Sequence, residues 1–156
     1  MRAVVVTVSD RSSRGERPDT SGPLLASLLV GAGCEVGPLV LVPDEVGAVQ
    51  QALRDAVAAG ADVVVTTGGT GLGPRDVTPE ATRPLLEREL PGIAEALRAV
   101  AREAVPTSVL SRGVAGTIGR VVVVNLPGST GGVRDGARVL VPVLAHAVSQ
   151  LAGGDH

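Results

Sequence analysis

The sequence lacks Phe, Tyr, Trp and Lys, and it has one Cys and two His among 156 residues. Without Lys it can form neither a Walker A loop nor a Schiff base, and Lys cannot be its general base. A single Cys excludes an internal disulfide, and one Cys with two His does not make the usual zinc site. The 14 basic residues are all Arg and are scattered, and no aromatic ring is available to stack on a base. Nucleic-acid binding is therefore disfavoured.

The composition otherwise indicates a folded protein. Hydrophobic residues make up 44% and charged residues 19%, which disfavours disorder, and the length fits a single domain over residues 1–156. No apolar run approaches a membrane span, and the N-terminal run is too short for a signal peptide, so we expect a cytoplasmic protein with no membrane partner. Cys34 is interpreted as a small buried residue and His146 as structural or surface filler.

Strand-like and helix-like segments alternate along the chain. Runs rich in β-branched residues predict strands at 2–9, 34–42, 61–67 and 120–129. Helices are predicted at 19–33, 44–60, 78–90, 91–104 and 132–151, with Thr78 as an N-cap, a break at Pro84 and a kink near Pro142. The segment 108–119 reads as an irregular stretch or hairpin. This alternation predicts an α/β fold with a mostly parallel sheet covered by helices on both faces.

Polar residues follow four of the predicted strands. In parallel sheets, ligands bind in the crevice at the carboxyl ends of the strands, so these four ends are the candidate site. They are Ser9–Arg11, Pro43–Glu45, Thr66–Gly71 and Asn125–Ser129.

A glycine-rich loop follows the third predicted strand. The glycines at 68, 69, 71 and 73 permit positive φ angles, which would let backbone N–H groups converge on an anion. Thr67 and Thr70 lie among them, and the segment predicted to bind phosphate runs from Thr67 through Gly68, Gly69 and Thr70 to Gly71. The alternative is a tight crossover from strand to helix, without a ligand.

Two aspartates stand near this loop in the predicted sheet. Asp76 precedes the predicted N-cap by two residues, so it either pairs with an Arg such as Arg75 or holds a divalent cation that bridges phosphates. Asp44 either caps the following helix or adds a second carboxylate to the same site. Ser9 and Asp10, after the first strand, belong either to a surface loop or to the site.

The turn Asn125-Leu-Pro-Gly-Ser129 precedes the last helix. It is either a capped loop or a second site for an anion or a ring, using the free N–H groups of that helix. Two anion sites with two or three carboxylates predict transfer of a phosphoryl or nucleotidyl group between two phosphorylated ligands. The residues alone identify neither substrate.

At these motifs the sequence resembles the molybdopterin adenylyltransferases of molybdenum cofactor synthesis, the MogA/MoaB type that includes the N-terminal domain of gephyrin. The resemblance spans nearly the whole chain, and the order and spacing of its motifs are specific. They are TVSDRSSRGERPDTSGP, VPDE, VVVTTGGTGLGPRDVTPEAT, EREL-PGI, VPTSVLSR and NLPGS.

This resemblance implies a three-layer α/β/α sandwich and a magnesium-dependent nucleotidyltransferase. It would transfer AMP from ATP to the phosphate of molybdopterin and release pyrophosphate. The resemblance implies Asp76 and Asp44 as the catalytic and Mg²⁺-binding residues and the loop 67–71 as the nucleotide site. It places molybdopterin at Asn125, Pro127, Gly128 and Ser129, with Ser9, Asp10 and Arg75 as further candidates.

The resemblance further implies a homotrimer, in some members a hexamer, and a partner in the protein that inserts molybdate. Two other functions stay open. The chain could be a non-catalytic molybdopterin- or nucleotide-binding scaffold of the same pathway, which predicts binding without pyrophosphate release. It could also be a Mg²⁺-dependent nucleotide hydrolase, which predicts ATP turnover without the pterin.

Overall fold

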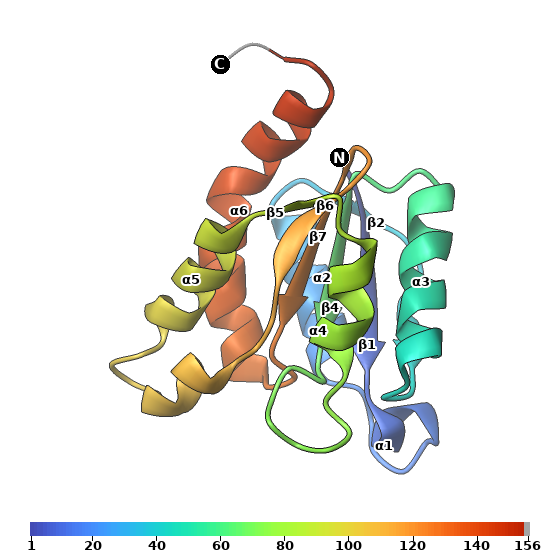
Figure 1. The fold of residues 1–156 in the computed structure, drawn as a ribbon, viewed down its shortest axis with the longest axis vertical. Helices are drawn as coiled ribbons and strands as arrows, with labels where there is room; N and C mark the ends of the chain where they lie inside the picture. Colours follow the sequence, from blue (N-terminus) through green and yellow to red (C-terminus); the bar gives the residue numbers. More distant parts are fainter. Residues whose placement is uncertain (155–156) are drawn as a thin grey trace.

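A seven-stranded sheet forms the middle layer of the molecule, and the computed structural model describes residues 1–154 (Figure 1). Its strands are β1 (Arg2–Val8), β2 (Glu35–Val36), β3 (Val40–Val42), β4 (Val63–Thr67), β5 (Arg88–Glu89), β6 (Ala115–Ile118) and β7 (Val121–Leu126). They are ordered β2-β1-β4-β7-β6-β5, with β3 also paired to β1. The pairs among β1, β2, β3, β4 and β7 are parallel, and β5–β6 and β6–β7 are antiparallel. The predicted mostly parallel sheet is confirmed.

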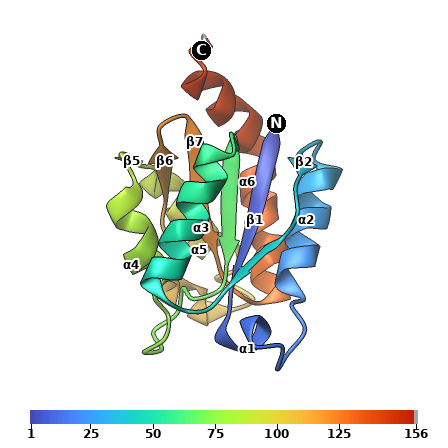
Figure 2. The ribbon, with the colours of Figure 1, turned by 90° about the vertical axis from the view of Figure 1, so that its right-hand side faces the viewer.

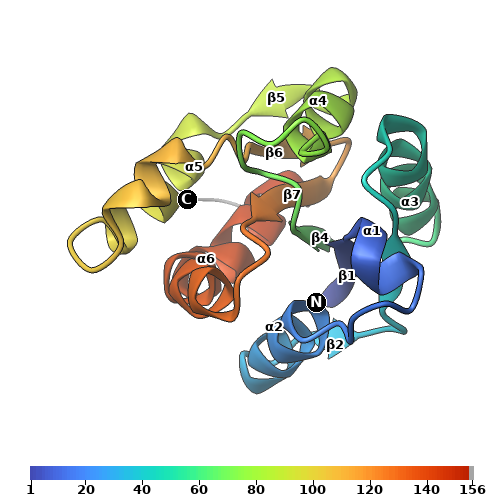
Figure 3. The ribbon, with the colours of Figure 1, turned by 90° about the horizontal axis from the view of Figure 1, so that it is seen from below.

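Helices cover both faces of this sheet, as Figures 2 and 3 show. The helices are α1 (Asp10–Ser13), α2 (Ser21–Gly31), α3 (Val46–Ala58), α4 (Thr78–Thr82), α5 (Pro91–Val100) and α6 (Thr130–Leu151), with 3₁₀ turns η1 (Arg83–Leu85) and η2 (Pro106–Leu110). One core packs α2, α5 and α6 against the sheet, and the other packs α3 and α4 against the opposite face. The three-layer α/β/α arrangement is therefore confirmed.

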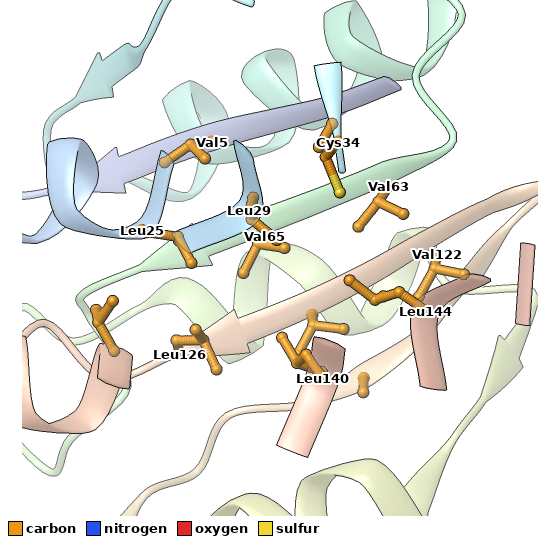
Figure 4. Packing of buried hydrophobic residues seen from close by; sticks show 14 residues of the cluster. Val5, Leu25, Leu29, Cys34, Val63, Val65, Val122, Leu126, Leu140 and Leu144 are labelled. Atoms are coloured by element: carbon orange, nitrogen blue, oxygen red, sulfur yellow. The ribbon is translucent and has the colours of Figure 1, made fainter. Parts of the chain in front are cut away.

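The core consists of Val, Leu and Ala, as the absence of aromatic residues requires. Figure 4 shows Leu25 and Leu29 of α2 and Leu140 and Leu144 of α6 meeting the valines of β1, β4 and β7. Cys34 belongs to this cluster and is buried, which confirms its predicted role, and burial raises the pKa of its thiol. Because β4 and β7 are buried on both faces, their valine runs do not alternate between hydrophobic and polar residues.

Several element boundaries differ from the predictions. The segment 34–42 forms two short strands, β2 and β3, because Gly37 and Pro38 interrupt the pairing with β1. The break at Pro84 is confirmed, since α4 ends at Thr82 and η1 follows. The helix predicted at 91–104 ends at Val100, so its predicted last turn is wrong.

The remaining differences lie around α4 and β6. Thr78 is the first residue of α4 and Val77 is the N-cap, so the predicted cap at Thr78 is wrong. The hairpin expected within 108–119 is formed instead by β6 and β7, which turn at Gly119–Arg120. Pro142 lies inside α6, and His146 is an exposed residue of the same helix. No helix within residues 1–154 is both long and apolar enough to cross a membrane.

Candidate functional site

A cleft of about 690 Å³ opens at the carboxyl ends of β1, β4 and β7, at the lower edge of the molecule in Figure 1. This volume is in the usual range for small-molecule sites. The strand ends and loops contribute Ser9, Asp44, Gly68, Asp76 and Ser129, and a second wall comes from the segment 101–111, which follows α5 and includes η2. The cleft thus lies at the edge of the sheet where the sequence predicts the site.

The loop after β4 presents three unpaired backbone N–H groups, those of Gly69, Thr70 and Gly71. In each trans peptide, the N–H points away from the carbonyl of the preceding residue. The preceding carbonyls in this loop accept hydrogen bonds from other residues, so the direction of each N–H is set. The Gly68 carbonyl accepts from the Thr78 hydroxyl (2.8 Å), and the Gly69 carbonyl accepts from the Thr78 N–H (3.0 Å). Thr78 thus orients these N–H groups rather than capping α4, and converging N–H groups of this kind suit an anionic ligand.

The glycines of this loop are required for two different reasons. Gly68 and Gly69 have φ angles of +105° and +65°, whereas Gly71 and Gly73 do not have positive φ. At Gly71 and Gly73, an added Cβ would lie 2.8 Å from an Asp76 carboxylate oxygen. The prediction of positive φ at all four positions is therefore wrong for these two, which instead make room for Asp76.

Two predicted phosphate-binding groups are occupied by internal hydrogen bonds. The Gly68 N–H donates to the Leu126 carbonyl (3.0 Å), and the Thr67 hydroxyl donates to the Pro127 carbonyl (2.8 Å). Both residues line the cleft, yet these bonds join the loop after β4 to the loop after β7. Among residues 1–154, the loop N–H groups that line the cleft without a hydrogen-bond partner are those of Gly69, Thr70 and Gly71.

Asp44 and Asp76 border the glycine loop. A Cβ at Gly69 would lie 3.1 Å from an Asp44 carboxylate oxygen. The Gly73 N–H donates to the Asp76 carboxylate (2.8 Å), while the Asp76 N–H donates to the Gly73 carbonyl (3.0 Å). Asp76 therefore closes a turn and also presents its charge to the cleft, and it does not pair with Arg75.

Asp44 is locked to Asp10 rather than to α3. The Asp10 N–H donates to the Asp44 carboxylate (2.7 Å), and the Asp44 N–H donates to the Asp10 carboxylate (3.0 Å). The N-cap of α3 is Glu45, so the capping alternative for Asp44 is wrong. Burial raises the pKa of the Asp44 carboxyl, and the negative charges of Asp10 and Asp76 raise it further. The hydrogen bond from the Asp10 N–H lowers this pKa but does not outweigh the other causes.

Asp10 and Arg75 connect loops instead of lining the cleft. The Arg75 guanidinium donates to both Asp10 carboxylate oxygens (2.9 and 3.1 Å). This bond and the Asp44 N–H hold the pKa of the Asp10 carboxyl below its ordinary value. Ser9 does line the cleft, and its hydroxyl accepts from the Ser12 N–H (3.2 Å) at the start of α1.

The loop after β7 leads into the N-terminus of α6. Ser129 caps this 22-residue helix by accepting from the Gly132 N–H (3.0 Å). Pro127, Gly128 and Ser129 line the cleft, and Gly128 packs against Gly68 so closely that a Cβ would lie 3.2 Å from its Cα. The N-terminus of α6, where the helix dipole favours negative charge, therefore lies at the cleft.

Asn125 differs from its neighbours in the same motif. Its side chain is 1% exposed, does not line the cleft and is fully hydrogen-bonded. The amide donates to the Thr66 and Thr82 hydroxyls (3.0 and 3.1 Å) and accepts from the Val114 N–H (3.2 Å). The assignment of Asn125 as a molybdopterin contact is corrected to a residue that ties β7 to β4, α4 and β6.

The sequence analysis missed several cleft residues. Asp19 accepts from the Thr7 hydroxyl (2.7 Å) and the Gly22 N–H (3.0 Å), so its carboxylate stands at the start of α2. The wall formed by the segment 101–111, after α5 and including η2, contributes Ala101, Val105 and Leu110. The motif VPTSVLSR marked this second wall, but nothing local in it indicated which side chains would face the cleft.

The cleft carries an excess of negative charge. Its lining includes the carboxylates of Asp19, Asp44, Asp76 and Asp135 but only one cationic side chain, Arg17. Within residues 1–154 no group of three or more His, Cys, Asp and Glu is arranged to hold a metal ion. Two carboxylates with bound phosphate oxygens and water are nevertheless a donor set that Mg²⁺ accepts. The residues present therefore fit a cation that binds together with an anionic ligand.

Comparisons with known proteins agree with this geometry. A family model described as a probable molybdopterin binding domain matches residues 4–146. The crystal structure of a molybdopterin biosynthesis protein from Mycobacterium abscessus is 50% identical, with a TM-score of 0.93 over 97% of this chain and 96% of that one. A molybdopterin adenylyltransferase of Pyrococcus furiosus is 44% identical over 91% of this chain and 86% of its own length.

Some relatives are longer than this chain. A molybdenum cofactor biosynthesis bifunctional protein of Chlorobaculum tepidum is 39% identical over 99% of this chain, which spans about half the length of that relative. The shorter relatives align over most of their own length, and the family model covers most of the sequence. The chain therefore belongs to the family of probable molybdopterin-binding domains, as its resemblance implied.

Proposed function

We propose that this protein transfers AMP from ATP to the phosphate of molybdopterin and releases pyrophosphate. One observation carries the proposal: Asp44 and Asp76 border the free N–H groups of residues 69–71 in a single cleft. The N-terminus of α6 lies in the same cleft and supplies a second set of donors for an anion. A site for two phosphorylated ligands is what this transfer needs. The name of the P. furiosus relative supports the same reaction.

The transfer needs little from a protein base. An oxygen of the molybdopterin phosphate attacks the α-phosphorus of ATP, the bond from that phosphorus to the bridging oxygen breaks, and pyrophosphate leaves. The attacking phosphate is already an anion at neutral pH. The N–H groups of Gly69, Thr70 and Gly71 would stabilise charge on the α-phosphate and the leaving group, because they are already oriented.

Mg²⁺ would be held by Asp76 and Asp44 together with nucleotide phosphate oxygens. When bound, it supplies positive charge that neutralises the phosphates. The support for this cation is the excess of carboxylates in the cleft and the raised pKa of Asp44, which shows that its charge is poorly compensated by the protein.

Molybdopterin would occupy the side of the cleft between the α6 N-terminus and the wall formed by the segment 101–111. Ser129 and its neighbours offer N–H groups to the phosphate, and Val105 and Leu110 offer an apolar surface to the ring system. Val105 and Leu110 are both about half exposed, so they are accessible to a ligand.

The test is pyrophosphate release from Mg-ATP with and without molybdopterin. Release that depends on the pterin would support the adenylyltransferase. Release without the pterin would instead favour a nucleotide hydrolase, and bound molybdopterin with no release would favour the non-catalytic scaffold. Protein concentration must be measured without absorbance at 280 nm, because the chain has no Trp or Tyr.

Arg17→Gln is expected to raise the KM for either ATP or molybdopterin, the two anionic substrates, about fivefold. This is the effect expected when an exposed ion pair with the substrate is lost. Arg17 lines the cleft and has no ion pair of its own within the described residues. The effect should shrink as salt is added, since the interaction is solvent-exposed. Arg14→Gln is the matched control, because Arg14 pairs with Glu16 and does not line the cleft. Equal effects of the two variants would contradict this role.

The homotrimer or hexamer, the partnership with a molybdate-insertion protein and the cytoplasmic location stay predictions. Apolar side chains lie exposed on several elements, among them Val30, Leu39, Val100, Val109 and Val141. Such surface is compatible with contacts between subunits.

A further inference from the structure

Arg112, which directly precedes Gly113 and the start of β6, is bound to the backbone of the glycine loop. Its N–H donates to the Thr70 carbonyl (2.9 Å), its Nε donates to the Gly71 carbonyl (2.8 Å) and its Nη2 donates to the Asp76 carbonyl (2.8 Å). Nη1 forms an ion pair with Glu80 of α4. One residue from a segment about 40 positions away in the sequence therefore holds three carbonyls of the loop.

These contacts determine where the loop's donors point. The Thr70 carbonyl and the Gly71 N–H belong to one trans peptide and point in opposite directions. The main-chain N–H of Arg112 holds that carbonyl, so the Gly71 N–H is directed toward the cleft, and the guanidinium fixes the next carbonyl, that of Gly71. The bond to the Asp76 carbonyl fixes the backbone from which the Asp76 carboxylate projects.

Few other contacts restrain this part of the loop. Residues 72–75 are exposed and form no helix or strand, and they are held by the Gly73–Asp76 turn and the Arg75–Asp10 ion pair. Neither of these contacts reaches the carbonyls of Thr70 and Gly71. We propose that Arg112 is a positioning residue that holds the N–H groups and the carboxylate of loop 69–76 in their reactive arrangement, an inference that rests on the proposed function.

A planar guanidinium is required for this task. Its N–H groups diverge in a fixed plane and reach the Gly71 carbonyl, the Asp76 carbonyl and Glu80 at once. A lysine ammonium is a single point of charge and cannot reproduce that fork. Arg112 also lines a second cavity of about 640 Å³ on the other side of the loop, together with Glu80, Arg83 and Arg98. A small guanidinium from solution can therefore reach the space that a truncated side chain would leave.

The test combines a measurement on the ligand-free protein with one on turnover. In Arg112→Ala and Arg112→Lys, hydrogen–deuterium exchange of the hydrogen-bonded amides of Gly73 and Asp76 should become faster, while exchange in β4 and α6 stays as in the unmodified protein. Pterin-dependent pyrophosphate release should fall about 10²-fold in kcat/KM, as for misplaced catalytic groups. Ethylguanidinium should restore part of the activity of Arg112→Ala, and Arg112→Lys should stay impaired.

Two variants serve as references. Arg83→Ala removes an arginine that lines the same cavity and pairs with Glu89, but this arginine does not contact the loop, so it should change neither readout. Glu80→Gln removes the ionic partner while leaving the three carbonyl contacts, and it should have a smaller effect than Arg112→Ala. If Arg112→Ala does not fold, Arg112→Lys and Glu80→Gln carry the test.

Each outcome decides the proposal separately from the proposed function. Unchanged exchange of the Gly73 and Asp76 amides in both Arg112 variants overturns the role of Arg112, whatever the reaction is. Faster exchange with normal turnover also overturns it, because the loop would then not need to be held. If the unmodified protein releases no pyrophosphate, the proposed function fails, and Arg112 is left without a reaction to position, whereas its hold on the loop is still measured by exchange.

Discussion

Asp76→Asn is expected to lower the rate of pterin-dependent pyrophosphate release about 10²-fold or more, as is typical for loss of a key electrostatic group. The substitution removes the charge that borders Gly71 and Gly73 in the cleft. It retains an oxygen that can accept the Gly73 N–H, so the turn that Asp76 closes should persist. The melting temperature of the variant should therefore equal that of the unmodified protein.

Asp76→Ala is the informative comparison. It removes both the charge and the acceptor for the Gly73 N–H, so it should lose stability as well as activity. Steady-state pyrophosphate assays and thermal unfolding of the two variants separate the electrostatic role from the structural one. Near-normal turnover of Asp76→Asn would refute the assignment of Asp76, and a large loss of stability in that variant would show that the turn needs the charge.

Asp44→Asn should also lose about 10²-fold in rate, but without a cost in stability. The pKa of Asp44 is raised in the folded protein, so the unfolded chain releases this proton at lower pH than the folded chain does. Stability therefore falls as the pH rises from the ordinary value of 3.8 through the folded pKa, and at neutral pH the ionised group is unfavourable. An asparagine is neutral and can still accept the Asp10 N–H.

Thermal unfolding at neutral pH checks this second prediction. Without divalent cations, Asp44→Asn should melt at the same temperature as the unmodified protein or higher. Addition of Mg²⁺ with ATP should raise the melting temperature of the unmodified protein and have a much smaller effect on the variant, because ligands that bind only the folded state stabilise it. A variant that melts clearly lower without Mg²⁺ would mean that the Asp44 charge supports the Asp10 contact instead of awaiting a cation.

The two aspartates illustrate how far the sequence alone could reach. Their positions after predicted strands placed them at the correct edge of the sheet, because parallel strands bring their carboxyl ends together. The reciprocal bonds between Asp10 and Asp44 could not be foreseen, since they depend on how β3 pairs with β1. Because of that pairing, Asp10 and Arg75 connect loops to each other, whereas Asp44 lines the cleft.

Asn125 shows a limit of a different kind. A strand that is polar on one face reveals which side chains point outward, but β7 is buried on both faces, and the other residues of β7 are valines and Leu126. The direction of the Asn125 side chain was therefore not readable from alternation. Only the register with Thr66 of β4 and the packing of α4 show that its amide is used inside the protein.

By itself, the sequence determined the long buried strands and most of the helices, the mostly parallel sheet, the aliphatic core and the edge at which the cleft opens. These features follow from local patterns of β-branched residues, helical periodicity and glycine-containing turns. Tertiary structure alone decided the short strands β2, β3, β5 and β6, which loop N–H groups stay free, how the segment after α5 forms the second wall, and that Arg112 holds the glycine loop. These features depend on contacts between segments distant in the chain, whose directions are set by strand register and packing rather than by neighbouring residues.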